Sequence, residues 1–287
     1  MIRVVVSGAG GRMGKLLLQA VIEEDDMELA GAVERKAHPL LNRDVGELIG
    51  SAKCGVLMRT DLEKVIGSGD ILVEFSTPKA TLSHLPVAVE KNTRIVIGTT
   101  GLNDEEKERI KESSSRIPIL LSPNMSIGVN LLFKTAGEVA RILGTEYDVE
   151  IVETHHRMKK DAPSGTALRL AEVIAQARGQ GTPTTPPPSR GRIKEGGQGL
   201  KGVVVYGRHG ITGERKRGAI GIHAVRGGTV SGEHNVIFAG ASERVELTHR
   251  AESRQVLIRA AIEAIRFIAG ASPGLYDMQD VIASQKG

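Results

Sequence analysis

The chain has 287 residues, of which 40% are hydrophobic and 25% charged, an ordinary globular composition with enough length for two domains. Its single cysteine, Cys54, excludes an internal disulfide, which fits a reducing cytoplasm, and no apolar stretch reaches the ~18 residues that span a bilayer. Lys and Arg are scattered among 34 acids, and with three Tyr, four Phe and no Trp a base-stacking surface is not expected. We therefore predict a cytoplasmic protein with neither a membrane nor a nucleic acid as partner.

The first part of the chain, up to about residue 125, alternates apolar runs with helical patterns. Strands are predicted at Ile2–Val6, Leu29–Val33, Ile71–Phe75, Arg94–Ile97 and Ile117–Leu121. Helices are predicted around a stripe from Met13 to Val21 and over Pro78–Lys91 and Asn103–Ser114. Strands that are apolar throughout and alternate with helices form parallel sheets covered on both faces. We therefore predict an α/β domain with a Rossmann-type, doubly wound parallel sheet.

The pattern changes near Asn124, after which the βαβ alternation is weaker. Tyr147–Thr154 alternates polar and apolar residues, which is typical of a strand with one exposed face. The remaining predicted elements are helices at Val129–Leu143, Ser164–Arg178 and Leu257–Ile268, and strands at Gly202–Tyr206, Ala219–Val225, Thr229–Phe238 and Arg244–Thr248. The Pro-rich segment Gly181–Ser189 is predicted to be an exposed loop. These elements predict a second, α+β domain with an open mixed sheet.

A glycine-rich turn, Gly8–Gly14 (GAGGRMG), lies where the first strand meets the first helix. A dinucleotide pyrophosphate needs backbone N–H groups and the positive end of a helix there, and side chains would block its approach. Glu34 ends the second strand, where an acid can accept hydrogen bonds from the adenosine ribose, and Arg35 could pair with a 2′-phosphate. The two residues therefore point to NADH, NADPH or both; the alternative is that they are solvated loop residues.

Three further segments follow predicted strands: Phe75–Pro78, Gly98–Gly101 and Ser122–Met125. In an open α/β sheet, ligands bind beyond the carboxyl ends of the strands, so these segments are candidate walls of a cofactor site. Ser76 and Thr77 could instead cap the helix that begins at Pro78, and Gly98–Gly101 could be a plain turn.

Acid–base groups are concentrated in Glu153–Ala167 (ETHHRMKKDAPSGTA), which runs from the alternating strand through a polar loop into a helix. His155, His156 and Lys159 bring proton donors together, and the free N–H groups of the helix start at Ser164–Thr166 form a seat for an anion. Such an arrangement suits the reduction of a small carboxylic acid, although Ser164 and Asp161 could simply be N-caps. The other histidines are interpreted as structural or exposed: His38, His84, His209, His223, His234 and His249. The spacing is not that of a zinc site, and no metal is predicted.

Taken in order, these segments resemble the 4-hydroxy-tetrahydrodipicolinate reductase (dihydrodipicolinate reductase) family from residue 1 to about residue 270. The His-His-Lys segment is the most specific; VEFSTP at Val73–Pro78, PNMSIGV at Pro123–Val129, RGGTVSGEH at Arg226–His234 and LTHRA at Leu247–Ala251 also match. The resemblance implies His155 as proton donor or acceptor, Lys159 as a second donor, and substrate contacts from His156, Gly165 and Thr166. It implies the following cofactor-binding residues: Gly8, Ala9, Gly10, Gly11, Arg12, Met13, Glu34, Arg35, Gly98, Thr99, Thr100, Ser122, Pro123, Asn124 and Met125.

The resemblance also implies a reaction of lysine and diaminopimelate biosynthesis. A hydride from NADH or NADPH would reduce the cyclic imine dicarboxylate made from pyruvate and aspartate semialdehyde, while the enzyme supplies the proton. It implies a homotetramer and a discontinuous dinucleotide-binding domain, residues 1–126 and 240–287, around a substrate-binding and oligomerisation domain, residues 127–239. Met125 departs from the Phe of many members. The basic run Arg208–Arg217 is interpreted as a solvated hairpin rather than as an attractor of a dianionic substrate.

The residues by themselves leave other functions open. Another Rossmann-type dehydrogenase of an amino-acid pathway, such as an aspartate or homoserine dehydrogenase, would use the same glycine turn. A nucleotide-sensing protein would also keep the turn, but acid groups beside an anion seat favour an enzyme. The sequence does not decide between NADH and NADPH, nor between the hydroxylated and the dehydrated imine as substrate.

Overall fold

The computed structural model describes residues 1–67, 69–180, 200 and 202–285, so the predicted loop Gly181–Ser189 lies outside the described residues. The chain divides into two units: unit 1 comprises Met1–Ile127 and Gln255–Gly287, and unit 2 comprises Gly128–Arg254. The sequence analysis placed the return to the first domain at residue 240, which is too early. Strand β11 (Arg244–Ala251) belongs to unit 2 because it is the antiparallel neighbour of β10 (Gly232–Ala239) along its whole length.

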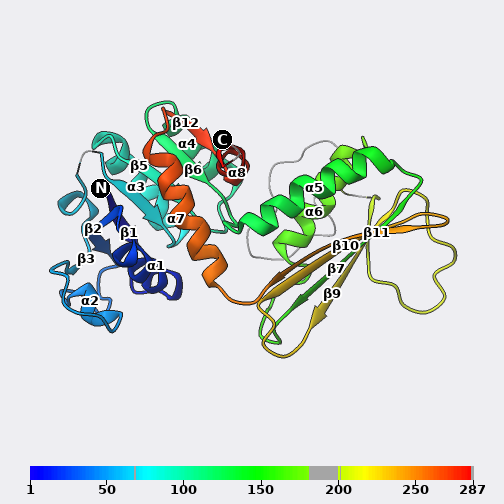
Figure 1. Ribbon diagram of the computed structural model, residues 1–287, viewed down its shortest axis with the longest axis horizontal. Helices are drawn as coiled ribbons and strands as arrows, with labels where there is room; N and C mark the ends of the chain where they lie inside the picture. The colour runs from blue at the N-terminus through cyan, green and yellow to red at the C-terminus, as the bar shows by residue number, and fades with distance from the viewer. Residues whose placement is uncertain (68, 181–199, 201, 286–287) are drawn as a thin grey trace. The chain divides into compact units, whose positions relative to one another are not determined.

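Unit 1 contains a seven-stranded sheet in the order β12-β6-β5-β4-β1-β2-β3 (Figure 1). Its strands are β1 (Ile2–Ser7), β2 (Met27–Val33), β3 (Met58–Arg59), β4 (Ile71–Glu74), β5 (Arg94–Ile97), β6 (Pro118–Leu121) and β12 (Gly274–Tyr276), and all of their pairings are parallel. Strands β2 and β3 follow on one side of β1, whereas β4, β5 and β6 follow on the other. The strand order therefore reverses between β1 and β4, which is where ligands bind in such sheets.

Helices cover both faces of this sheet. On one face, Leu17 of α1 (Arg12–Glu23) and Ile265 of α7 (Gln255–Ala269) share a core with Val6 of β1. On the other, Leu85 of α3 (Pro78–Glu90) and Ile110 of α4 (Asp104–Ser114) pack with Leu72 of β4. This arrangement confirms the predicted doubly wound Rossmann-type sheet. The elements that the sequence analysis did not predict are too short to show a periodicity: α2 (Val45–Leu48), β3, the 3₁₀ helix η1 (Leu62–Lys64), β12 and α8 (Met278–Ser284).

Unit 2 contains a five-stranded sheet in the order β11-β10-β7-β9-β8, with α5 (Ile127–Leu143) and α6 (Gly165–Ala177) on one face (Figure 1). The other strands are β7 (Asp148–His155), β8 (Val204–Tyr206) and β9 (Ile220–Arg226). β7 pairs parallel with β9 and antiparallel with β10, so the predicted mixed sheet is confirmed. The alternation of β7 places Val149 and Ile151 in the core beneath the helices.

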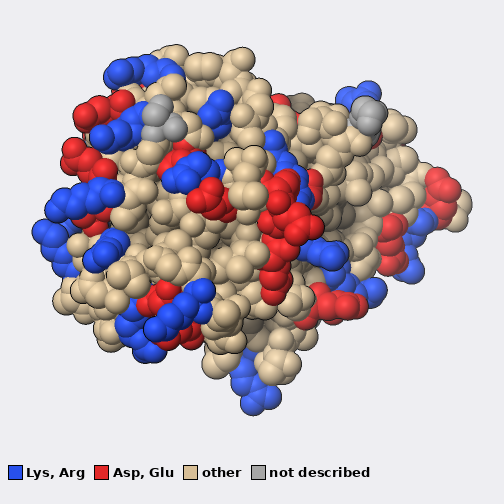
Figure 2. Space-filling view, turned by 60° about the vertical axis from the view of Figure 1, so that its left-hand side comes forward, with Lys and Arg blue, Asp and Glu red and all other residues tan. Residues whose placement is uncertain are grey.

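Charged side chains of both signs are interspersed on the face of the molecule shown in Figure 2, where Lys and Arg groups lie beside Asp and Glu groups. In unit 1, Arg266 pairs with three acids, Glu24, Asp26 and Glu263. Within the part of the chain that the structure describes, no helix is both long and apolar enough to cross a bilayer.

Candidate active site

The glycine-rich turn between β1 and α1 is closely packed against the neighbouring strand end. Gly8 has a φ of +73°, and a Cβ atom added there would come within 2.5 Å of the carbonyl oxygen of Phe75. A Cβ on Gly14 would lie 2.1 Å from the carbonyl oxygen of Gly8, so both positions require glycine. Gly11 is the N-cap of α1 and no side chain caps the helix, which leaves backbone N–H groups for an anionic ligand. Ala9 is fully buried.

Glu34 is tied to this turn by its carboxylate. Its Oε1 accepts a hydrogen bond from the N–H of Gly10 (3.1 Å), and its Oε2 accepts one from the N–H of Arg35 (2.9 Å). Glu34 is therefore an ordered part of the turn rather than a solvated loop residue, whereas the side chain of Arg35 is exposed. The His38 ring packs on the same turn, because a Cβ on Gly10 would lie 2.3 Å from its Cε1 atom.

The segments after β4, β5 and β6 turn several of their side chains inward. Thr99 is buried and its hydroxyl accepts a hydrogen bond from the N–H of Ser76 (3.3 Å), while Thr100 is exposed. Thr77 caps α3 by accepting from the N–H of Ala80 (3.3 Å), as the capping interpretation predicted.

The segment after β6 is similar. The Ser122 hydroxyl donates to the carbonyl oxygen of Asn124 (2.7 Å), and Pro123 is exposed. Met125 is buried in the core that it shares with α1 and α7, so its side chain lies in the core rather than in an open wall.

In unit 2, Glu153 is the centre of a buried polar network. Its carboxylate accepts hydrogen bonds from His155 Nδ1 (2.5 Å), from the Ser164 N–H (3.0 Å) and from both terminal nitrogens of Arg226 (2.9 and 2.7 Å). Burial would raise the pKa of Glu153, but the hydrogen bonds from His155 and Arg226 outweigh it and lower the pKa to about 2. Glu153 is therefore an ionised carboxylate at neutral pH although it is fully buried.

This network holds His155 at the end of β7. With Nδ1 engaged by Glu153, Nε2 is the ring nitrogen left for other chemistry. The ring stands edge-to-face against His234 with a centroid separation of 5.3 Å. On the backbone, the carbonyl oxygen of His155 accepts from the N–H of Gly227 (3.0 Å), and the N–H of Arg157 donates to Gly228 (3.2 Å). The turn after β9 thus fixes the start of the His-His-Lys loop.

Lys159 and His156 lie in that loop. The Lys159 ammonium donates to both carboxylate oxygens of Asp161 (3.0 and 2.8 Å). Burial would raise the pKa of Asp161, but the hydrogen bond from Lys159 lowers it. Asp161 is therefore a partner of Lys159 and not the N-cap of α6. His156 is half-buried, and among the described residues its Nδ1 atom has no hydrogen-bond partner.

The start of α6 combines a cap with an open surface. Ser164 is the N-cap of α6, which was one of the interpretations offered from the sequence. Its hydroxyl accepts a hydrogen bond from the Ala167 N–H (3.2 Å) and lies 3.1 Å from His234 Nε2. Burial and the nearby His155 lower the pKa of His234 to about 3, so this ring is neutral at pH 7. Gly165 is exposed, and nothing lies within 4 Å of a Cβ added there. The site therefore keeps open space beside the N–H groups of a helix.

Three residues of this network, Glu153, Arg226 and His234, received no role in the sequence analysis. A signal for Glu153 exists in the sequence: it continues the buried face of β7 after Val149 and Ile151, and a carboxylate on a buried face needs a partner. The partner cannot be read from the sequence, because Arg226 and His234 come from β9 and β10.

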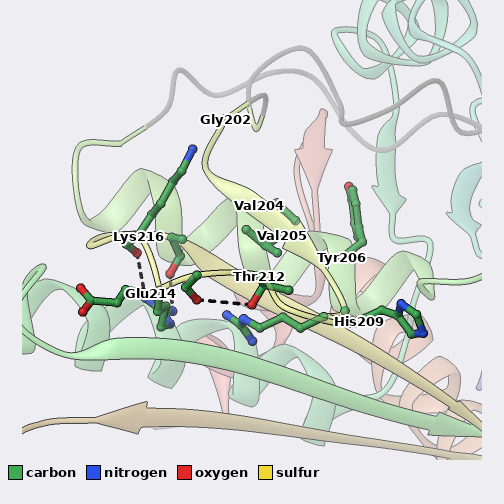
Figure 3. A pocket seen from close by; sticks show the side chains of 13 residues that line it. Gly202, Val204, Val205, Tyr206, His209, Thr212, Glu214 and Lys216 are labelled. Carbon is green, nitrogen blue, oxygen red and sulfur yellow. Dashed lines mark hydrogen bonds between the residues drawn. The ribbon is translucent and has the colours of Figure 1, made fainter.

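The basic run Arg208–Arg217 lies elsewhere in unit 2. It borders a hollow of about 630 Å³ that is lined by Tyr206, His209, Lys216 and other residues of this segment (Figure 3). Arg208 donates twice to Glu150 (3.0 and 2.8 Å), and Arg215 pairs with Glu150 and with Asp148. The run connects β8 to β9, which pair in parallel, so it is a crossover loop and the predicted hairpin is wrong. Two of its cations are balanced by carboxylates of β7, which weighs against a role as an attractor of a dianionic substrate.

A Rossmann-type sheet with an uncapped helix at its glycine turn is typical of nicotinamide-dependent oxidoreductases, and the polar network of unit 2 supplies acid–base groups that such an enzyme can use. Two family models match the chain: "Dihydrodipicolinate reductase, N-terminus" over residues 2–125 and "Dihydrodipicolinate reductase, C-terminus" over residues 128–282. The chain therefore belongs to the dihydrodipicolinate reductase family, as the sequence resemblance indicated.

Individual relatives agree with this assignment. The chain is 44% identical over 282 residues to the 4-hydroxy-tetrahydrodipicolinate reductase of Syntrophus aciditrophicus, covering 98% of each chain. It is 45% identical over 281 residues to that of Aromatoleum aromaticum, covering 98% of this chain and 95% of the relative. Among solved structures, a dipicolinate-bound dihydrodipicolinate reductase from Paenisporosarcina sp. TG-14 is similar with a TM-score of 0.70 and 25% identity, covering 96% of this chain and 97% of that chain.

Proposed function

We propose that the protein reduces 4-hydroxy-tetrahydrodipicolinate to tetrahydrodipicolinate with NADH or NADPH, as a step of lysine and diaminopimelate biosynthesis. The observation that carries the proposal is the hydrogen-bond network of Glu153, His155 and Arg226, which lies beside the open start of α6. Glu153 and His155 belong to the same segment of chain as Lys159. Family membership and the names of the relatives support the same reaction. In net terms, the hydroxylated substrate gains one hydride and one proton and releases water.

In unit 1, the glycine turn and the segments after β4, β5 and β6 would hold the cofactor, which supplies the hydride when bound. The uncapped start of α1 suits its pyrophosphate, because free N–H groups and the helix dipole both favour an anion. Glu34, which is bonded to the N–H of Gly10, would accept a hydrogen bond from a ribose hydroxyl, and the exposed Arg35 would pair with a 2′-phosphate. This domain, with the return of the chain placed at Gln255, is the proposed dinucleotide-binding domain.

In unit 2, the residues of the network would handle the substrate and its proton. Glu153 would orient His155 through Nδ1 so that Nε2 exchanges a proton with the substrate. Lys159 would serve as a second proton donor once the substrate displaces it from Asp161. The N–H groups at Gly165 and Thr166 and the ring of His156 would bind the carboxylates of the dianion.

The proposal includes assembly and location. We propose a cytoplasmic homotetramer formed through unit 2, in which both described helices, α5 and α6, lie on the same face of the sheet. Light scattering coupled to size-exclusion chromatography tests the tetramer directly, since a monomer would elute with a mass near 30.6 kDa.

A coupled assay tests the function. Pyruvate and aspartate semialdehyde are condensed by the preceding synthase, and oxidation of NADH and of NADPH is followed at about 340 nm, the reduced nicotinamide band. We expect oxidation that depends on the synthase, and the ratio of the two rates gives the cofactor preference. Oxidation of aspartate or homoserine with NAD⁺ or NADP⁺ as the hydride acceptor would instead favour another amino-acid dehydrogenase. Folded protein that binds NADH but catalyses none of these reactions would favour a nucleotide sensor.

A further inference from the structure

A second buried acid, Glu74, has no role in the proposed reaction. It is the last residue of β4 and is fully buried, next to the point where the strand order of the parallel sheet reverses. Its carboxylate accepts hydrogen bonds from His84 Nδ1 (2.5 Å), from the Ser76 hydroxyl (2.7 Å) and from the Thr81 hydroxyl (3.4 Å). Among the described residues, neither Lys nor Arg forms a salt bridge with it, so His84 of α3 is its one nitrogen-bearing side-chain partner. A buried carboxylate needs such partners, and removing one leaves it strongly destabilised.

The contacts around Glu74 reach three segments that end at the same edge of the sheet. The carbonyl oxygen of Glu74 accepts from the N–H of Gly98 (2.9 Å) and from the Thr99 hydroxyl (3.3 Å), both of which follow β5. The Thr81 hydroxyl donates to the Thr99 hydroxyl (2.9 Å), so one helix residue bonds to the segments after β4 and β5. Ser7, at the end of β1, places its hydroxyl 3.4 Å from His84 Nδ1.

These segments also interlock around Phe75, the residue after Glu74. The N–H of Phe75 donates to the carbonyl oxygen of Ser7 (3.3 Å). A Cβ added to Gly8 would lie 2.5 Å from the carbonyl oxygen of Phe75. A Cβ on Gly98 would lie 2.4 Å from its ring. A small shift of the chain after Glu74 would therefore move both the glycine turn and the Gly98–Thr100 segment, because closely packed atoms transmit a displacement to their neighbours.

We propose that Glu74 and His84 are positioning residues for the nicotinamide cofactor. They do not touch the reacting atoms; they hold the segments after β1, β4 and β5 in the one arrangement in which their backbone atoms meet the cofactor. The proposal rests on the proposed function in one respect, namely that these segments bind NADH or NADPH. Breaking the pair weakens cofactor binding and leaves the acid–base groups of unit 2 as they are.

The opposite end of β4 offers a matched control. Asp70, the residue before β4, is also a buried carboxylate, 1% exposed, and accepts from Arg3 Nε (2.9 Å) and from the N–H of Gly67 (2.7 Å). It lies at the amino ends of the strands, away from the edge that binds ligands. Asp70→Asn therefore tests the effect of losing a buried carboxylate in the same sheet without touching the cofactor segments.

The experiment compares the dissociation constant of NADH, by its fluorescence, for the full-length wild type, Glu74→Gln, His84→Gln, the double variant and Asp70→Asn, with thermal unfolding of each. We expect both single variants to raise the dissociation constant by about 10- to 100-fold, as a displacement of positioning groups does. The double variant should add little to either, because the two residues act as one pair. KM for the cofactor should rise with them while kcat at saturating cofactor stays within a few fold, a split that general loss of stability does not produce.

Two results would overturn the proposal: unchanged NADH binding in folded variants of the pair, or an equal loss of binding in Asp70→Asn. If Glu74→Gln does not fold, His84→Gln decides by itself, since His84 is partly exposed, at 17%, and tolerates the change more easily. A wild type that binds neither NADH nor NADPH would instead overturn the proposed function, and this inference with it.

Discussion

Each unit of the molecule contains one fully buried glutamate whose carboxylate lies 2.5 Å from the Nδ1 atom of a histidine: Glu74 with His84 in unit 1 and Glu153 with His155 in unit 2. The pairs differ in their other partners. Glu153 also binds the two terminal nitrogens of Arg226, whereas Glu74 is bound by the hydroxyls of two neighbouring residues. They also differ in where their members come from. Glu153 and His155 lie two residues apart on β7, whereas Glu74 ends β4 and His84 belongs to α3.

The difference teaches what each pair can do. Arg226 balances the charge of Glu153 whether or not His155 is protonated, so His155 can gain or lose a proton without leaving an unpaired charge in the core. Glu74 has no Lys or Arg partner among the described residues, so its hydrogen bond from His84 must persist. The pair in unit 2 therefore suits proton transfer, and the pair in unit 1 suits positioning.

The largest expected effect is on kcat, and it distinguishes the role of His155 from that of His84. His155→Gln should lower kcat by roughly 10²- to 10⁴-fold, the usual contribution of a general acid or base, with little change in the affinity for NADH. His84→Gln should instead act on KM for the cofactor. Steady-state kinetics measures both, and His209→Gln, at an exposed position of the basic run, is the control. If His155→Gln turned over at the wild-type rate, the acid–base assignment would be wrong.

A second effect concerns stability. Glu153→Gln should lower the free energy of unfolding by about 3–5 kcal/mol, because it leaves the guanidinium of Arg226, whose side chain is only 20% exposed, without its counter-charge. Glu74→Gln should cost less, about 1–3 kcal/mol, since an amide oxygen can still accept from Ser76 and Thr81. Hydrogen exchange of the β7 and β4 amides, at pH 7, reports on each unit separately. Equal losses for the two variants would contradict the proposed difference between the pairs.

The pH dependence of unit 2 follows from the same network. The pKa of Glu153 is lowered from 4.5 to about 2, because the hydrogen bonds from His155 and Arg226 outweigh the effect of burial. Its stabilisation is therefore fully present above about pH 5 and is lost as the pH falls toward 2. Urea unfolding at several pH values in this window should show a stability difference between wild type and Glu153→Gln that shrinks with acid. A difference that stays constant from pH 7 to pH 3 would argue against an ionised, hydrogen-bonded carboxylate.

The smallest effects come from the glycines of the two helix starts. Gly14→Ala should lower stability by about 1–3 kcal/mol, because its Cβ would overlap the carbonyl oxygen of Gly8. Gly165→Ala has open space and should change stability by less than about 0.5 kcal/mol, yet raise KM for the cyclic substrate by narrowing the anion seat. Thermal unfolding and substrate KM, measured on both variants, distinguish these cases. A Gly165→Ala enzyme with unchanged KM would remove Gly165 from the substrate site.

Local patterns were enough for much of the fold and part of the candidate site. The apolar runs and helical stripes identified the strands β1, β2, β4, β5 and β6 and the helices between them, because period and length are properties of a short stretch of chain. The glycine turn and Glu34 were identified for the same reason, since their function depends on position relative to one strand and one helix.

Contacts between distant segments were decided only by the tertiary structure. The return of the chain at Gln255 depends on the pairing of β11 with β10, and nothing within β11 itself specifies its neighbour. In the same way, Arg226 reaches Glu153 because β9 pairs in register beside β7, and His84 reaches Glu74 because α3 folds back over β4. By itself, the sequence determined the longer elements, the glycine turn and the His-His-Lys segment. The tertiary structure alone decided which buried charges neutralise each other, because those partners are brought together by sheet register and helix packing rather than by spacing along the chain.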